Sequence, residues 1–289
     1  MFAPLSKVQT IACKSNLSET ETKKVLSIEL LPDGFSLLIA SGNPLNFELL
    51  ETYSYIDGVA QLNFSQIFRE LQSAYLAADS NFYKANVLYF NPQYVLVPAE
   101  LYSDSSGKTL QEFCNQKPEG YAVHADRLQR LNAYGIFPYP ESLGNELRAT
   151  IPNSQLFHTS AFIIESALES LQNNPQEFHV LLNIKSSHFE ILLFNKGKLQ
   201  YCNAFYYKTL ADLMYYLFYV LEQFNKDPGQ MTIALAGEIE ETSANFQYLS
   251  FYFNKVVLAM PSRLPENLPE EWSGNVHRYY NLIQAALCE

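Results

Sequence analysis

Residues 25–41 read VLSIELLPDGFSLLIAS, and residues 178–194 read FHVLLNIKSSHFEILLF. Each stretch is an apolar run of strand length that breaks at a turn signal and then resumes as a second apolar run. The first turn signal is Pro32-Asp33-Gly34, and the second is the polar stretch Lys185-Ser186-Ser187. This pattern is typical of a β-hairpin, so the sequence predicts two hairpins in separate halves of the chain.

The elements that follow each hairpin come in the same order. A third strand is expected next, then a helix with one apolar face, and then a short apolar strand. The two series start 155 residues apart, at Val25 and Val180. The expected elements are a strand at 46–56, a helix from Asn63 or Ser65 and a strand at 85–90 in the first half, and a strand at 198–205, a helix at 209–224 and a strand at 231–236 in the second.

A three-stranded meander followed by a crossover helix makes a mixed sheet that helices cover. Because this order occurs twice, the predicted fold class is α/β with duplicated domains, each a mixed five-stranded sheet with helices on both faces. The predicted domains are 24–150 and 151–289. They follow an arm at 1–23 that lacks periodicity and is either loose or an edge addition.

Shorter elements are expected in the rest of the chain. No element is predicted between 121 and 140, where Pro138 and Pro140 lie. The other expected elements are a strand at 94–98, helices at 107–115, 141–149, 160–172 and 242–254, a strand at 256–260, a Pro-rich acidic loop at 261–273 and a closing helix.

Composition narrows the function. Nineteen Lys and Arg against thirty Asp and Glu give a net charge of −11, which disfavours binding to nucleic acid or to anionic membrane surfaces. We expect no membrane insertion, because no window approaches the ~18 apolar residues of a membrane span, and we expect a soluble, cytoplasmic protein. The four cysteines lie far apart, which argues against a zinc site and a disulfide framework. Glycine is scarce, with 11 in 289 residues. Loops that bring backbone close to phosphate should therefore be few.

This arrangement resembles the actin-like ATPase superfamily, which has a ribonuclease H-like fold and includes sugar kinases, Hsp70 and the pilus-assembly protein PilM. More narrowly, the chain resembles an uncharacterised family of Bacteroidetes proteins, a domain of unknown function regarded as having this fold. The strand at 94–98, followed by Glu100-Leu101-Tyr102, is part of that likeness. The resemblance implies a nucleotide cleft, with ATP and Mg²⁺ as the cofactors to test.

In actin-like ATPases the first hairpin has an acid, an apolar residue and a glycine before a turn that holds phosphate. This chain has Glu29 where the acid stands and Leu31 where the glycine stands, with Asp33-Gly34 at the turn. The resemblance implies that Glu29 could hold a hydrated Mg²⁺. The alternative is a strand-end carboxylate that is bonded locally. The Cβ of Leu31 would crowd the path of a phosphate.

The second hairpin should repeat that motif, but Asn183 replaces the acid and Lys185 replaces the glycine, with Ser186 next at the turn. Lys185 could bind a phosphate through its own positive charge, or it could be a solvated turn lysine. A third signature, a glycine pair that supports adenosine, is reduced to Gly237 followed by Glu238. These eight positions, Glu29, Asp33, Gly34, Asn183, Lys185, Ser186, Gly237 and Glu238, are the candidate cofactor-binding residues of a degenerate cleft.

Tyrosines suggest a different kind of site. On the helix at 209–224, Tyr215, Tyr216 and Tyr219 flank the apolar face. A tyrosine at an interface buries its ring while its hydroxyl stays wet, so these residues are candidate contacts with another protein. Packing within the chain is the alternative. Trp272, the only Trp, could dock a partner or cover the second domain.

The predicted function is therefore a cytoplasmic scaffold that binds another protein and is non-catalytic or only weakly nucleotide-binding. A homo-oligomer is one form that such an interaction could take. The first alternative is an ATPase or phosphotransferase that uses Glu29 with Mg²⁺. The second is a small-molecule binding protein whose cleft has been refilled by aromatic residues. The absent acid at Asn183 and the absent glycines at Leu31 and Lys185 favour the scaffold, because phosphoryl transfer needs positioned donors and metal.

Overall fold

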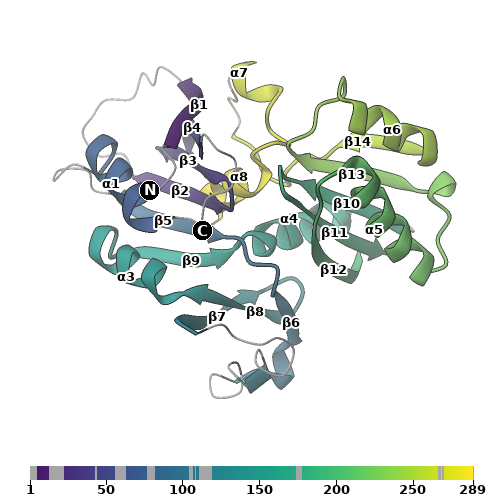
Figure 1. Cartoon of the computed structure of the whole chain (residues 1–289), viewed down its shortest axis with the longest axis horizontal. Helices are drawn as coiled ribbons and strands as arrows, with labels where there is room; N and C mark the ends of the chain where they lie inside the picture. The colour runs from purple at the N-terminus through teal and green to yellow at the C-terminus, as the bar shows by residue number, and fades with distance from the viewer. Residues whose placement is uncertain are drawn as a thin grey trace. The chain divides into compact units, whose positions relative to one another are not determined.

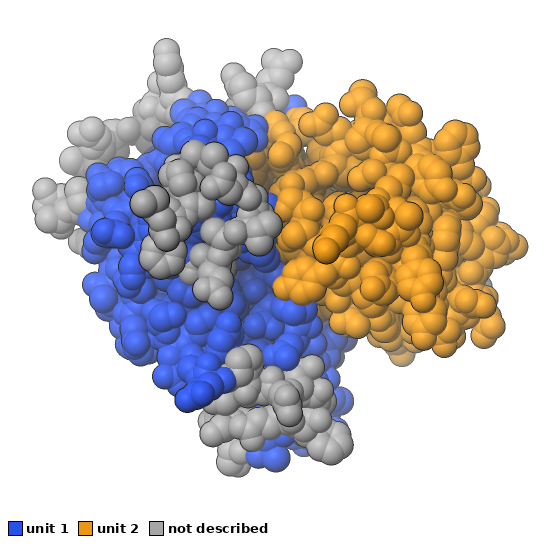
Figure 2. Space-filling view, viewed as in Figure 1, with its two compact units in different colours: residues 1–162, 263–273, 281–289 blue, residues 163–262, 274–280 orange. Residues whose placement is uncertain are grey.

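The computed structural model describes two compact units of the chain. Unit 1 comprises 1–162, 263–273 and 281–289, and unit 2 comprises 163–262 and 274–280 (Figure 2). Most of the expected helix at 107–115 lies outside the described residues. Cys13 and Cys114 also lie outside them. The structure describes residues 5–12, 23–42, 44–55, 63–76, 82–103, 107, 109–110, 119–173, 178–265, 268 and 270–288.

Unit 1 contains a mixed sheet whose described strands have the order β1-β4-β3-β2-β5-β9 (Figure 1). The strand β2 pairs antiparallel with β3 and parallel with β5, as a hairpin followed by a crossover requires. Its elements are β1 (Leu5–Ala12), β2 (Lys24–Leu31), β3 (Gly34–Ser41), β4 (Asn46–Tyr55), α1 (Phe64–Ala74), β5 (Phe82–Tyr89), β6 (Val95–Pro98), the 3-10 turn η1 (Ala99–Leu101), β7 (Tyr121–Leu128), β8 (Ala133–Pro140), α3 (Glu141–Thr150), β9 (Ser154–His158), the start of α4 (Thr159–Asn173), α7 (Glu270–Ser273) and nearly all of α8 (Tyr280–Leu287).

Alternation along the strands separates the two faces of this sheet. Leu26, Ile28 and Leu30 of β2 pack with α1 and α3 in one buried core. The opposite face carries Leu88, which packs with Phe162 of α4 and Ala285 of α8. Helices therefore cover both faces of the sheet, as predicted.

A second sheet of unit 1, with the strand order β6-β8-β7, was not predicted from the sequence. Pro138 and Pro140 lie inside β8, opposite Val123 and Tyr121 of β7. The strand β6 pairs only with residues 133–136 of β8. The two prolines therefore lie where β7 is the one described neighbour of β8. On the side without a neighbour no strand needs a backbone N–H from β8, so a proline is tolerated there.

Unit 2 has a five-stranded sheet with the order β12-β11-β10-β13-β14 (Figure 1). Thr209 begins α5 with a capping box, because its hydroxyl accepts the Asp212 N–H and the Asp212 side chain accepts the Thr209 N–H. Lys196 and Gly197 both have positive φ, as the predicted β11–β12 hairpin requires. Its elements are the rest of α4, β10 (Phe178–Ile184), β11 (His188–Asn195), β12 (Lys198–Tyr206), α5 (Leu210–Gln223), the 3-10 turn η2 (Pro228–Gln230), β13 (Thr232–Gly237), α6 (Ala244–Tyr252) and β14 (Lys255–Leu258).

Strand register relates the first hairpin to the second. Leu31 is the last residue of β2 before a two-residue turn. Lys185 holds the same place after β10, because its N–H donates to the His188 carbonyl across a two-residue turn. Glu29 and Asn183, two positions earlier, are therefore equivalent. This register matches the motif comparison made from the sequence.

The strand β1 is the edge addition that was one of two alternatives for residues 1–23. It pairs antiparallel with β4. Buried Glu51 of β4 accepts hydrogen bonds from Lys7 Nζ at 2.7 Å and from Thr10 Oγ1 at 3.3 Å, both on β1. The hydroxyls of Tyr53 and Tyr75 donate to the same carboxylate. One carboxylate therefore fastens the edge strand to the sheet.

We predict that Glu51→Gln lowers the free energy of unfolding by about 1–3 kcal/mol, because a charged acceptor of several hydrogen bonds is lost. Burial raises the pKa of Glu51, but hydrogen bonds from Lys7, Tyr75 and Tyr53 outweigh burial and hold that pKa below its usual value of 4.5. A depressed pKa in the folded state means that this stabilisation is full above pH 4.5 and is lost as the pH falls through the lower folded value.

Urea unfolding at pH 7 and at pH 3.5 measures this effect. Glu70→Gln on the exposed face of α1 is the matched control and should be nearly neutral. Equal stability of Glu51→Gln and Glu70→Gln at pH 7 would show that the carboxylate does not hold the edge strand.

Candidate functional site

The first candidate half-site is the end of the β2–β3 hairpin. The Glu29 side chain is 1% exposed, and its Oε1 accepts a hydrogen bond of 3.2 Å from Asn281 Nδ2 on α8. A carboxylate enclosed in this way leaves no room for the waters that Mg²⁺ retains, so the residues at this turn do not fit a hydrated ion. In the part of the chain that the structure describes, no group of three or more His, Cys, Asp or Glu residues could hold a metal ion.

The turn itself packs against β4. The Asp33 carbonyl accepts the Tyr55 N–H at 2.9 Å and the Ser54 hydroxyl at 3.2 Å. A Cβ on buried Gly34 would lie 2.0 Å from the Tyr53 carbonyl oxygen. The close approach of β4 therefore explains why this position is glycine, and the explanation does not involve a ligand.

The second candidate half-site is the end of the β10–β11 hairpin. Asn183 Nδ2 donates to Glu190 Oε2 at 2.7 Å, and both side chains are buried. Lys185 is 5% exposed, so the alternative of a solvated turn lysine is wrong. Its carbonyl accepts the Tyr207 hydroxyl at 2.6 Å. Ser186, at the tip of the turn, is exposed.

Gly237 and Glu238, at the end of β13, lie beside this hairpin. The Gly237 N–H donates to the His277 carbonyl at 2.8 Å, and the Glu238 N–H donates to the Ile184 carbonyl at 2.6 Å. Gly237 has φ +88°, and a Cβ there would lie 2.0 Å from the Ile184 oxygen. Its glycine is therefore required by backbone conformation and packing.

These hydrogen bonds limit what the second half-site can do. A phosphate cradle depends on backbone N–H groups that point at the ligand. The N–H groups of Lys185, Gly237 and Glu238 already donate to carbonyls within unit 2. These three N–H groups are therefore not available to hold a phosphate.

A different surface of unit 2 is rich in exposed aromatic side chains. Two come from α5 and three from α6, and we call the five together the aromatic surface. The Tyr215 and Tyr219 rings stack with centroids 6.3 Å apart, and Phe218 of α5 contacts Tyr252 of α6 at 5.1 Å. The members and their exposed fractions are Tyr215 (65%), Tyr219 (52%), Tyr248 (40%), Phe251 (84%) and Tyr252 (42%).

The other two predicted interface residues are less accessible. Tyr216 is half-buried and stacks on Phe205, with ring centroids 4.8 Å apart. Trp272 is 1% exposed and packs against Phe47 at 4.9 Å. Its ring therefore belongs to the interior of unit 1.

The sequence analysis missed the α6 part of the aromatic surface. Residues 246–253 read FQYLSFYF, and only Leu249 and Phe253 of them are buried. A helix whose apolar residues lie all round its axis has no single core face. That distribution was the available signal that some of these rings must be exposed.

Comparisons with known proteins agree with this fold. A family model described as a protein of unknown function (DUF3822) matches residues 14–256. Searched against curated proteins, the chain gives no match. It is similar to a protein of unknown function with an actin-like ATPase fold from Bacteroides thetaiotaomicron VPI-5482, with a TM-score of 0.73 and 19% identity over 92% of this chain and 96% of that one.

Two further solved structures are similar. A chain of the PilM–PilN type IV pilus biogenesis complex matches with a TM-score of 0.65 and 12% identity over 91% of this chain and 97% of that one. The ethanolamine utilization protein EutJ from Carboxydothermus hydrogenoformans matches with a TM-score of 0.50 and 8% identity over 94% and 91%. The predicted actin-like fold and the predicted similarity to PilM are confirmed. No helix among the described residues is long and apolar enough to span a membrane.

We predict that Gly237→Ala destabilises the protein by about 2–4 kcal/mol, because alanine is strained at positive φ and its Cβ would overlap the Ile184 carbonyl. Gly274→Ala is the matched control, since no atom lies within 4 Å of a Cβ built there. Chemical denaturation measures both variants. A Gly237→Ala protein as stable as Gly274→Ala would show that the glycine is not required by the fold.

Proposed function

Because the chain belongs to the DUF3822 family of proteins of unknown function and has the actin-like ATPase fold, we propose that it is a cytoplasmic scaffold that binds another protein and does not turn over ATP. The docking site is the aromatic surface of unit 2, with Tyr216 at its edge. The observation that carries this proposal is the exposure of five large aromatic side chains on two neighbouring helices.

Exposure of this kind is typical of an interface. Soluble monomers seldom leave a cluster of large rings in water, and Tyr and Phe are enriched where proteins meet. The Tyr248 and Tyr252 hydroxyls lie 3.2 Å apart, so polar groups lie among the rings. A neighbouring pocket of about 350 Å³, lined by Phe218, Leu221, Pro228 and three polar residues, offers a place for a partner side chain.

Two observations favour binding over catalysis. The candidate Mg²⁺ ligand Glu29 is enclosed, and the amides of the second half-site donate within unit 2. The PilM–PilN complex supports a protein partner, since a protein of similar fold functions there as a member of a protein complex.

We predict that millimolar Mg-ATP leaves the thermal unfolding midpoint unchanged, because a ligand that does not bind the native state does not stabilise it. Differential scanning fluorimetry measures the midpoint, and Glu29→Gln, which keeps the size of the side chain, is the control. A rise with Mg-ATP in the natural chain that disappears in Glu29→Gln would favour the ATPase alternative.

We predict that a photo-crosslinking amino acid at Tyr215 captures a discrete protein in the native cytoplasm, whereas the same group at Tyr83 does not. Both tyrosines are 65% exposed, but Tyr83 lies on β5 of unit 1 and is not part of the aromatic surface of unit 2. The purified partner should then bind the Tyr215→Ala/Tyr219→Ala variant at least about 30-fold more weakly, as for interface residues that contribute 2 kcal/mol or more.

Capture of a second copy of the chain would identify a homo-oligomer as the form of the interaction. Identical products from Tyr215 and Tyr83, or an unchanged affinity of the double variant, would remove the aromatic surface from consideration.

A further inference from the structure

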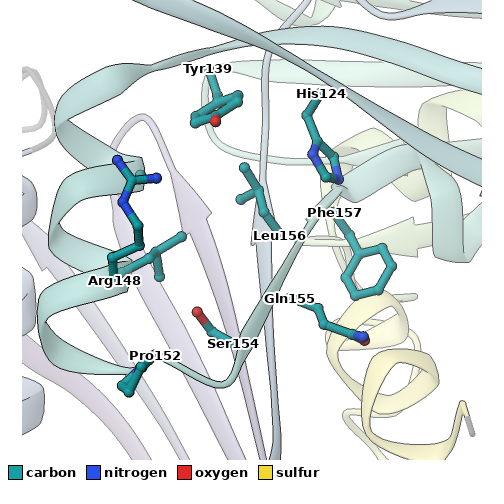
Figure 3. A pocket seen from close by; sticks show the side chains of 10 residues that line it. His124, Tyr139, Arg148, Pro152, Ser154, Gln155, Leu156 and Phe157 are labelled. Carbon is teal, nitrogen blue, oxygen red and sulfur yellow. The ribbon is translucent and has the colours of Figure 1, made fainter. Parts of the chain in front are cut away.

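Unit 1 contains a pocket that neither the scaffold proposal nor the nucleotide motifs use. Its volume is about 420 Å³. Side chains from β7, β8, α3 and β9 line it, and Figure 3 shows Arg148 and Tyr139 on one side, His124 on the other and Leu156 between them. The polar lining residues are His124, Tyr139, Arg148, Ser154 and Gln155.

The lining is unusual in charge for a chain of net charge −11. It contains a guanidinium, an imidazole, an amide and two hydroxyls, and it contains no carboxylate. The Arg148 side chain is oriented by Asn145, whose Oδ1 accepts from Nη2 at 2.6 Å. Arg148 is exposed, and its positive charge is the feature of the lining that attracts an anion.

Gly144 brings the Arg148 and Tyr139 tips to one place. A Cβ built on Gly144 would lie 3.5 Å from Arg148 Nη1 and 3.6 Å from the Tyr139 hydroxyl. Two hydrogen-bond donors therefore converge above a position that has no side chain. A guanidinium and a phenol at this spacing suit the two oxygens of a carboxylate.

The exposed edge of β9 beside the pocket is already occupied at two positions. The His124 imidazole is hydrogen-bonded to the backbone of Leu156, and the His158 N–H donates to Asp126 Oδ2 at 2.7 Å. Both side chains come from β7. An extended peptide could not pair with these groups, so the pocket suits a short ligand better than an added strand.

Burial determines the charge on these two side chains. Burial lowers the pKa of His124 and raises the pKa of Asp126 well above its usual value. Both shifts favour the neutral forms of the two groups, whose Nε2 and Oδ1 lie 3.5 Å apart. Arg148 remains the charged group of the lining.

We propose that this pocket binds a carboxylate that carries an apolar group, with the carboxylate on Arg148 and Tyr139 and the apolar group against Leu147, Pro152 and Leu156. This site is separate from the aromatic surface of unit 2 and does not depend on the scaffold proposal. Two sources share the chemistry, a small carboxylic acid and the terminal carboxylate of a peptide. The pocket volume admits a ligand of one or two residues in size.

Calorimetric titration with N-acetyl-leucine tests the proposal, with N-acetyl-leucinamide as the uncharged counterpart. The acid should bind at least about tenfold more tightly than the amide, as expected for loss of a charged hydrogen-bonded pair. A tetrapeptide that ends in leucine, with a free or an amidated terminus, forms the second arm. Tighter binding of the free peptide than of N-acetyl-leucine would identify a peptide terminus as the source, and the reverse order would identify a small acid.

Variants locate the site. Arg148→Gln should abolish the preference for acid over amide, whereas Arg69→Gln, an exposed arginine on α1, should leave it unchanged. Gly144→Ala should weaken binding of the acid, since its methyl group would lie 3.0 Å from the Tyr139 ring. The helix should stay folded, because alanine is a better helix former than glycine. The NMR signals of the His124 ring should shift on binding in the natural chain. Three results would overturn the proposal. They are equal affinity for acid and amide, failure of all four probes to bind, and a preference for the acid that Arg148→Gln does not change.

Discussion

In each large sheet one interior strand, β2 in unit 1 and β10 in unit 2, determines where its neighbours lie. In both units the first strand of a hairpin pairs antiparallel with its successor and parallel with the strand that returns after the helix. That strand is buried on both faces and fixes the register of its neighbours. In unit 2, the pairing of β10 with β13 brings the end of β13 beside the β10–β11 turn. The residues compared with the second and third nucleotide motifs therefore meet at one place in this unit.

In this chain, internal contacts take up that meeting point. The carbonyl of Ile184 accepts the Glu238 N–H, and the carbonyl of His277 accepts the Gly237 N–H. A buried lysine stands where the motif has glycine. A phosphate would have to displace the carbonyl acceptor from each of these N–H groups, at the cost of leaving a buried carbonyl unpaired. The chain therefore has the actin-like fold, while the backbone groups at these positions bond within unit 2, and we propose function on other surfaces.

The sequence predicted the large elements well because they depend on local pattern. Apolar runs with turn signals predicted the hairpins, and the three-and-four spacing of Ile67, Leu71, Ala74, Tyr75 and Ala78 predicted α1. The buried face of α1 includes Ile67 and Leu71 together with Phe64 and Phe68. The motif comparison also treated Glu29 and Asn183 as equivalent positions of the two halves, and the strand register agrees. The family resemblance supplied the fold name, which periodicity alone does not give.

What the sequence did not show depends on neighbours distant in the chain. No element was predicted around Pro138 and Pro140, because their open side in β8 depends on where β6 pairs. The burial of Lys185 and Trp272 and the convergence of Arg148 with Tyr139 over Gly144 are likewise tertiary facts.

The amides of Lys185, Gly237 and Glu238, at the ends of β10 and β13, donate to carbonyls of unit 2, and we expect none of them to bind a phosphate. Amide hydrogen exchange of these three residues, followed by NMR with and without Mg-ATP, measures whether they do. We predict slow exchange at all three amides that nucleotide does not change. Fast exchange without nucleotide and protection on its addition would show that these amides bind the nucleotide.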